Sequence, residues 1–191
     1  MNYPNNIKKE YHKQISYANR GMDLEAIIND TNNYYLEKDI AVIYKKPTPI
    51  GISKVSYKNN KMVIDKAYFA NQSTLDYNGI YKGKYIEFDA KSTECKTSFP
   101  ISNVSAHQIE HIRRILKHGG ICFLIIRMNS KFYLLDGNNF IDFINTESRK
   151  SIPYSYIQEF SYELEYNYLK GLNYIQFVDL IIGGKNEKNK N

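Results

Sequence analysis

The sequence lacks tryptophan, contains only two cysteines, and has no run of about 18 apolar residues. Cys95 and Cys122 are too few for a disulfide framework or a zinc cluster, so we expect ordinary reduced thiols. The missing apolar run argues against a membrane-spanning helix, and residues 1–20 lack the apolar centre of a secretory signal. We therefore expect a cytoplasmic protein without a membrane partner.

Acidic residues are also in deficit, because 20 Asp and Glu stand against 26 Lys and Arg, which gives a net charge of +6. A basic balance is consistent with a polyanionic partner such as nucleic acid, although many basic proteins bind none. The length of 191 residues allows one domain with a sizeable core but hardly two full ones.

Composition divides the chain into three parts. Residues 1–20 are basic and poor in aliphatic side chains, which predicts a flexible N-terminal arm. Residues 21–182 carry the apolar patterns of a single folded domain, with an insertion at residues 45–69. Residues 183–191 are polar and glycine-rich and predict a disordered tail.

Apolar periodicity predicts a mixed order of helices and strands within the domain. Stripes at the helical period favour helices over 22–38 and 104–118, the second ended by Gly119-Gly120. The other expected elements are strands at 39–46, 50–56, 61–69, 121–127, 131–136 and 173–180, and a short helix within 153–170. This order indicates a mixed α/β (α+β) class, with a central mixed sheet flanked by helices.

The segment YIEFDAK, residues 85–91, carries the most informative pattern. Its apolar residues alternate with polar ones, so one face of a strand is expected to meet the core. The other face gathers Glu87, Asp89 and Lys91. A lysine on this face can stabilise the transition state of phosphodiester hydrolysis or orient the attacking water, or it can simply screen its acidic neighbours at the surface.

The turn that precedes this strand decides which side chains face one another. A two-residue turn at Lys82-Gly83 places Asp76 opposite Asp89, with Cβ atoms roughly 5 Å apart, and Thr74 opposite Lys91. Two facing carboxylates repel each other, but a divalent cation bound between them makes the arrangement electrostatically favourable. Mg²⁺ prefers oxygen ligands of this kind. By propensity Asn78-Gly79 is the better turn and would separate the two acids. A bulge at Gly83 would shift the pairing by one residue, and an ordinary solvated strand face is a further alternative.

The helix expected at 104–118 adds a second set of polar side chains. Gln108 lies inside its apolar stripe, where its amide oxygen could meet a metal site or the amide could be satisfied within the core. His107 and His111 have half the spacing of a zinc site but no suitable third ligand, so phosphate contacts are preferred. Glu25, on the flank of the first helix, is a weaker candidate for a supporting base.

The chain resembles the RecU family of Holliday junction resolvases over most of its length. The matching segments are YANRGMDLEAIINDTNNYY at 17–35, IAVIYKKPTPI at 40–50, STLDYNGIYKGKYIEFDAK at 73–91, KTSFPISNVSAHQIEHIRRILKHGGICFLIIR at 96–127 and KSIPYSYI at 150–157. The similar spacing of these segments makes the resemblance far more specific than any single motif.

The resemblance implies a restriction-endonuclease-like nuclease core of the PD-(D/E)XK type, which cuts four-way DNA junctions in recombination and repair. It implies Asp76 and Asp89 as acidic metal ligands, Lys91 as the motif lysine, and Thr74 and Gln108 as residues that help to hold Mg²⁺ or Mn²⁺. It also implies a homodimer, and partners among recombinase and branch-migration proteins. Two sites related by symmetry suit a junction that must be cut on two strands.

Three positions depart from the family pattern. Leu75 stands where the motif has proline, Asp89 where relatives usually have Glu, and Glu87 where they often have Asp. The shorter acid at 89 leaves open a non-catalytic junction-binding protein that retains the nuclease fold. A nuclease of the same superfamily with another DNA substrate is a third interpretation.

The insertion at 45–69 corresponds to a protruding stalk in the family. It contains six lysines and one acid, Asp65; the lysines are Lys45, Lys46, Lys54, Lys58, Lys61 and Lys66. Such a basic β-stalk would meet phosphates on several sides inside a junction. The alternative is a surface hairpin whose lysines protect its edges.

Overall fold

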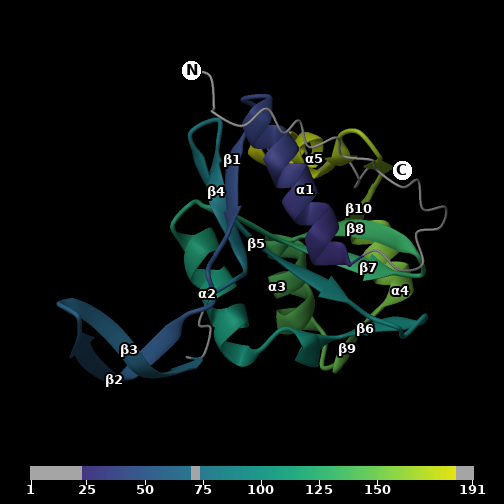
Figure 1. Cartoon of the computed structure of the whole chain (residues 1–191). Coiled ribbons are helices and arrows are strands. Elements are labelled where there is room, and N and C mark those ends of the chain that lie inside the picture. The colour runs from purple at the N-terminus through teal and green to yellow at the C-terminus, as the bar shows by residue number, and fades with distance from the viewer. Residues whose placement is uncertain (1–22, 70–73, 184–191) are drawn as a thin grey trace.

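A six-stranded mixed sheet forms the centre of the computed structural model, which describes residues 23–69 and 74–183 (Figure 1). Its strands, in spatial order, are β1 (Val42–Lys45), β4 (Tyr77–Tyr81), β5 (Lys84–Ser92), β7 (Ile121–Met128), β8 (Lys131–Asp136) and β10 (Ser161–Leu164). β5 and β7 run parallel, whereas the other neighbouring strands are antiparallel. The sheet confirms the predicted mixed α/β class.

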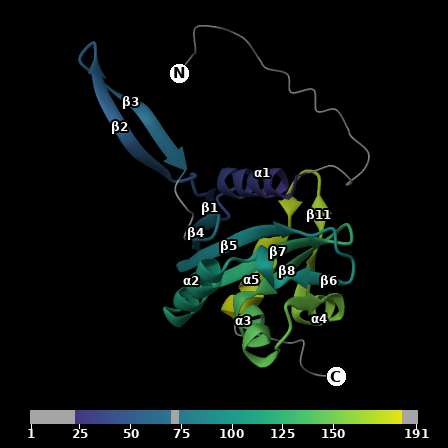
Figure 2. The same ribbon diagram turned by 90° about the horizontal axis from the view of Figure 1, so that it is seen from below.

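Helices cover both faces of the sheet, as Figure 2 shows for α1 on one side and α2 and α3 on the other. α1 (Leu24–Glu37) and α5 (Tyr174–Ile182) pack on one face. α2 (Ala106–Lys117), α3 (Gly137–Thr146) and α4 (Tyr154–Phe160) pack on the other. α2 is the crossover helix that a parallel pair of strands requires, here between β5 and β7. It ends before Gly119, whose φ of 77° suits a residue without a side chain.

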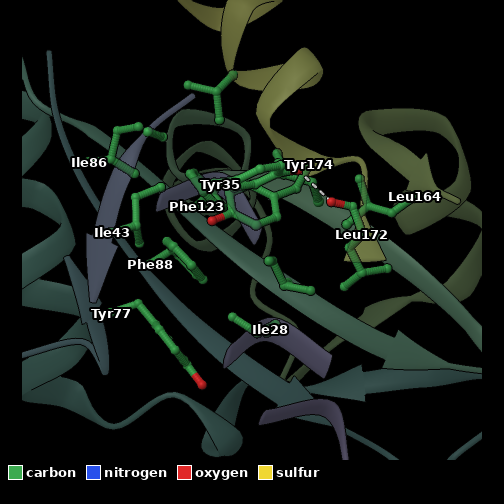
Figure 3. Packing of buried hydrophobic residues seen from close by; sticks show 14 of the residues in the cluster. Ile28, Tyr35, Ile43, Tyr77, Ile86, Phe88, Phe123, Leu164, Leu172 and Tyr174 are labelled. Carbon is green, nitrogen blue, oxygen red and sulfur yellow. Dashed lines mark hydrogen bonds between the residues drawn. The ribbon is translucent and has the colours of Figure 1, made fainter. Parts of the chain in front are cut away.

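The core beneath α1 and α5 is rich in aromatic rings (Figure 3). Phe88 of β5 stacks between Tyr77 and Phe123, with ring centroids 4.9 and 4.7 Å apart, and Tyr174 lies against both phenylalanines. β7 is buried on both faces, because helices cover it from both sides. That burial explains the uninterrupted apolar run at its start.

The insertion forms a two-stranded hairpin that projects away from the sheet (Figures 1 and 2). It consists of β2 (Ile50–Lys58) and β3 (Lys61–Phe69), joined at Asn59-Asn60. Both asparagines have positive φ, 50° and 57°, as a tight hairpin turn requires. Every residue of β3 is exposed, so the structure confirms the predicted protruding β-stalk.

Short elements complete the chain: β6 (Ser98–Pro100), the 3-10 helix η1 (Ile101–Asn103), β9 (Ser151–Pro153), β11 (Tyr166–Asn167) and β12 (Gly171–Leu172). The strand predicted at 173–180 is wrong, because α5 occupies this segment. Tyr174 and Val178 are buried one helical turn apart, with Ile181 packed against the same core, which is the helical period.

The predicted arm at 1–20 lies outside the described residues, as does the predicted tail apart from Gly183. Within the described part of the chain, no helix is both long and apolar enough to cross a membrane.

Candidate metal and catalytic site

The β4–β5 hairpin has the register that brings the two candidate acids together. Its turn is at Lys82-Gly83, with Tyr81 opposite Lys84 and Tyr77 opposite Phe88. Gly79 is paired inside the hairpin, so the alternative turn at Asn78-Gly79 does not form. A Cβ at Gly79 would lie 2.1 Å from the Val42 carbonyl oxygen, which shows that glycine serves here to let β1 approach.

Asp76 and Asp89 lie side by side where β4 begins. The Asp76 carbonyl oxygen accepts a hydrogen bond from the Lys46 amide at 2.7 Å, which continues the β1–β4 pairing to this residue. Asp89 is fully buried. The pKa of Asp89 is raised to about 6, chiefly by burial; Lys91 opposes the rise, and the adjacent Asp76 carboxylate adds to it. Two neighbouring carboxylates therefore share a site that disfavours both being charged.

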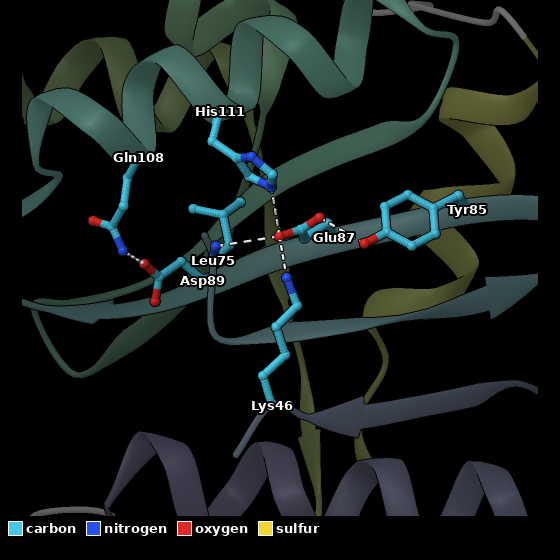
Figure 4. A network of polar contacts seen from close by, with 7 residues as sticks. All are labelled: Lys46, Leu75, Tyr85, Glu87, Asp89, Gln108 and His111. Carbon is cyan, nitrogen blue, oxygen red and sulfur yellow. Dashed lines mark hydrogen bonds and ion pairs between the residues drawn. The ribbon is translucent and has the colours of Figure 1, made fainter. Parts of the chain in front are cut away.

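Asp89 is also where the other candidate side chains converge. Its Oδ2 accepts hydrogen bonds from Lys91 Nζ and Gln108 Nε2, both at 2.8 Å, and the second is drawn in Figure 4. Its Oδ1 accepts from the Ala90 amide at 2.8 Å. The strand supplies Asp89 and Lys91, and α2 supplies Gln108 from above the same face. The polar face of β5 is thus covered, and the alternative of a solvated strand face is wrong for Asp89.

Gln108 presents its nitrogen to Asp89, whereas the sequence suggested its oxygen for a metal. The oxygen Oε1 accepts a hydrogen bond from the Ser105 amide at 3.1 Å, as part of the capping box that begins α2. A bond from Oε1 to a metal would need the amide to leave this cap. Gln108 therefore positions Asp89 in this structure, and its role as a direct ligand remains a prediction.

Replacing Gln108 by leucine is expected to lower the free energy of unfolding by about 1–2 kcal/mol, because it removes both the cap and a donor to a buried carboxylate. Urea unfolding checks this value. Gln158→Leu, at an exposed position of α4, is the matched control and should change stability by less than about 0.5 kcal/mol. Equal effects at the two positions would contradict the assignment.

Three further candidates lie around this centre. Thr74 is half-buried in the bend two residues before Asp76, and its part in metal binding remains a prediction. Glu25 forms an ion pair with Lys45, and that hydrogen bond raises the pKa of Lys45. His107 faces outward, with Nε2 3.1 Å from the Ser105 hydroxyl.

The donor set fits a hard divalent cation. Among the described residues, no group of three His, Cys, Asp or Glu side chains is placed to hold a metal ion in the closed manner of a structural zinc site. Mg²⁺ instead takes one or two carboxylates and completes its shell with water and substrate oxygens. The adjacent carboxylates of Asp76 and Asp89 fit this requirement, and a cation between them would relieve their repulsion.

A second buried carboxylate, Glu87, to which the sequence assigned no role, lies beside the first (Figure 4). Glu87 is 1% exposed and accepts hydrogen bonds from four groups. Its Oε1 accepts from Lys46 Nζ, from the Leu75 amide at 3.2 Å and from His111 Nε2 at 2.8 Å; Oε2 accepts from the Tyr85 hydroxyl at 2.7 Å.

These hydrogen-bond donors lower the pKa of Glu87. Burial pushes its pKa up, but the hydrogen bonds from Lys46 and Tyr85 outweigh burial and lower the pKa. Asp89 adjoins a second carboxylate, that of Asp76, so Asp89 is the better candidate for a metal ligand on this strand. His111, for which phosphate contacts were expected, contacts Glu87 instead.

Comparison with known proteins gives consistent matches. A family model described as "RecU: Recombination protein U" matches residues 19–180. The Holliday junction resolvase RecU of Streptococcus gordonii is 45% identical over 98% of this chain and 100% of its own. That of Geobacillus sp. (strain WCH70) is 48% identical over 88% of this chain and 87% of its own. Among solved structures, Archaeoglobus fulgidus Hjc, a Holliday junction resolvase, is 9% identical with a TM-score of 0.41, covering 69% of this chain and 90% of that one.

Proposed function

We propose that this chain, which belongs to the RecU family, is a Holliday junction resolvase that cuts four-way DNA by metal-dependent phosphodiester hydrolysis. The observation that carries the proposal is the pair of adjacent carboxylates, Asp76 and Asp89, with Lys91 bound to the second. The names of the relatives support the substrate, and the match spans 100% of the Streptococcus gordonii protein.

In the proposed reaction, the residues of the site have three roles: they bind the metal, contact the phosphate or the attacking water, and position Asp89. Asp76 and Asp89 would hold Mg²⁺ or Mn²⁺, with Thr74 as a further oxygen donor. When bound, the metal lowers the pKa of its water and neutralises the scissile phosphate. Lys91 has its ammonium 2.8 Å from Asp89 Oδ2 and retains two N–H donors for a phosphate oxygen or the attacking water. Gln108 keeps the Asp89 carboxylate in place from α2.

The proposal makes cleavage depend on both the metal and the DNA structure. Four-way junction DNA should be cut symmetrically with Mg²⁺ or Mn²⁺, and cutting should stop with EDTA, because two carboxylates alone cannot activate water. Linear duplex of the same length should be cut far more slowly. The assay is separation of labelled strands on a denaturing gel. Binding without cutting would favour the non-catalytic alternative, and equal cutting of both substrates would favour a nuclease of another specificity.

The lysines of the stalk support a DNA partner. Lys58 and Lys61 flank the turn at its tip and are both exposed; the Lys58 ammonium lies 3.8 Å from the carboxylate of Asp65 on the same stalk. Neutralised phosphates release counterions, so junction binding should weaken steeply with salt. Recombinase and branch-migration partners, and a cytoplasmic location, remain predictions from the sequence.

We also propose a homodimer, which we expect to show as twice the chain mass in light scattering. An exposed apolar row crosses three strands: Val42, Ile80 and Tyr85 are paired neighbours and are 38%, 52% and 41% exposed. Contiguous apolar surface of this kind is typical of an interface. Ile80→Lys is expected to shift the mass towards one chain, whereas Leu169→Lys, in the exposed turn between β11 and β12, should not. A monomeric wild-type protein would refute the dimer.

A further inference from the structure

Residues on both sides of the stalk, Lys46 before it and Leu75 after it, bind the carboxylate of Glu87. Lys46 is the last residue before Pro47 and the path into β2, and its Nζ binds Glu87 Oε1. Leu75 lies on the return path, and its amide donates to the same oxygen at 3.2 Å. Two described residues, one before the stalk and one after it, thus bind one oxygen atom of Glu87 in β5.

The carboxylate is itself held firmly from the other side. Tyr85 of the same strand binds Oε2, and His111 of α2 reaches Oε1, so strand and helix both fix its orientation. Glu87 is 1% exposed and the Lys46 side chain 20%. An ion pair this far from water is costly to break, since either partner alone would be buried without its counter-charge.

The same residues adjoin the metal acids. Leu75 precedes Asp76 directly, and the Lys46 amide donates to the Asp76 carbonyl oxygen at 2.7 Å. Glu87 and Asp89 lie two residues apart on one face of β5, roughly 6.6 Å along the strand. A displacement of Lys46 at the base of the stalk would therefore reach Asp76 through the Lys46 amide, and it would reach the strand that holds Asp89 through Glu87.

We infer that Glu87 is a positioning residue that couples the seating of DNA on the stalk to the alignment of Asp76 and Asp89. Cleavage is then fast only on DNA that engages the stalk, so the Glu87–Lys46 contact contributes to the preference for junctions over linear duplex. The inference rests on the proposed resolvase function and names how that site would be regulated.

The test compares Glu87→Gln, Lys46→Met and the double variant in the full-length protein with Mg²⁺. Single-turnover cleavage rates and Kd are measured on a four-way junction and on linear duplex. We expect each single variant to cut the junction roughly 10–100-fold more slowly, with Kd within about 3-fold, because one misplaced contact costs that much in alignment. The rate on linear duplex should stay unchanged, so the ratio of the two rates falls. The double variant should be no slower than the slower single one, because both changes break the same contact.

Glu163→Gln is the matched control, since it removes one acid from an exposed pair with Lys131 and should change neither rate. If Glu87→Gln fails to fold, Lys46→Met still removes the contact from the stalk side alone. Equal losses on both substrates, or additive losses in the double variant, would overturn the coupling and leave Glu87 as general support. A wild-type protein that cuts no junction would instead refute the proposed function itself.

Discussion

Asp76→Asn and Asp89→Asn are each expected to lower the rate of junction cleavage by on the order of 10³-fold or more, about 4 kcal/mol of transition-state stabilisation. The reason is that the two carboxylates are the acidic donors that adjoin each other beside Lys91. An amide keeps the size of each side chain but supplies no charge to hold a cation. Junction binding should be largely retained, because the lysines of the stalk are untouched.

The control variant changes a carboxylate that lies outside the site. Asp142, exposed on α3, serves this purpose, and Asp142→Asn should cut junctions at the wild-type rate. Single-turnover rates and gel-shift Kd values on the same junction separate chemistry from binding. Full activity in either active-site variant would refute the assignment of that acid. Loss of binding together with cleavage would place the acid in DNA recognition.

The sequence predicts which face of the strand bearing Asp89 meets the core, but it leaves the register of the hairpin open between two turns. Period-two alternation over 85–91 fixes which face of the strand meets the core, and in the structure a Lys-Gly turn fixes the register. The competing Asn78-Gly79 turn has the better propensity, but a turn there would remove Gly79 from its contact with β1. Tertiary packing thus decided between two locally acceptable turns.

The Glu87 contacts were not predictable in the same way. They join residues 41, 24 and 12 positions away in the sequence, and no local pattern relates Lys46, His111 and Leu75 to one another. The one available signal was a carboxylate on the polar face of β5 together with His111 at the polar edge of the helical stripe. The direction of the Gln108 amide was likewise hidden, because a capping box and a metal ligand both need its oxygen.

The helix α5 shows why short apolar runs are ambiguous. YIQFVDLII can be read with either period, and β-branched and aromatic residues favour a strand. The tertiary structure decides between the two. β10 is the edge strand next to β8, and the segment instead packs as a helix against the core beneath α1, with Tyr174 and Val178 buried there.

Asp89→Asn is further expected to stabilise the metal-free protein at neutral pH. Burial raises the pKa of Asp89 to about 6, above the 3.8 of an unperturbed Asp. The stability linked to this raised pKa is fully present below pH 3.8 and is lost as the pH rises through about 6. At pH 7.5 with EDTA, Asn should therefore raise the free energy of unfolding by between about 1 and 3 kcal/mol, less where the lost contact with Lys91 offsets the gain.

Urea unfolding of both proteins from pH 4 to pH 8 checks the sign, because titratable groups that do not interact with Asp89 cancel in the difference. Near pH 4 the two proteins should be almost equally stable. The difference between their free energies of unfolding should then grow between pH 4 and pH 7. Millimolar Mg²⁺ at pH 7.5 should then stabilise the wild-type protein and leave the Asn variant nearly unchanged, since a ligand stabilises only the state that binds it. A gap that stays constant with pH would show that the cost of burying Asp89 does not come from its charge, and the physical reason for a cation at this site would be lost.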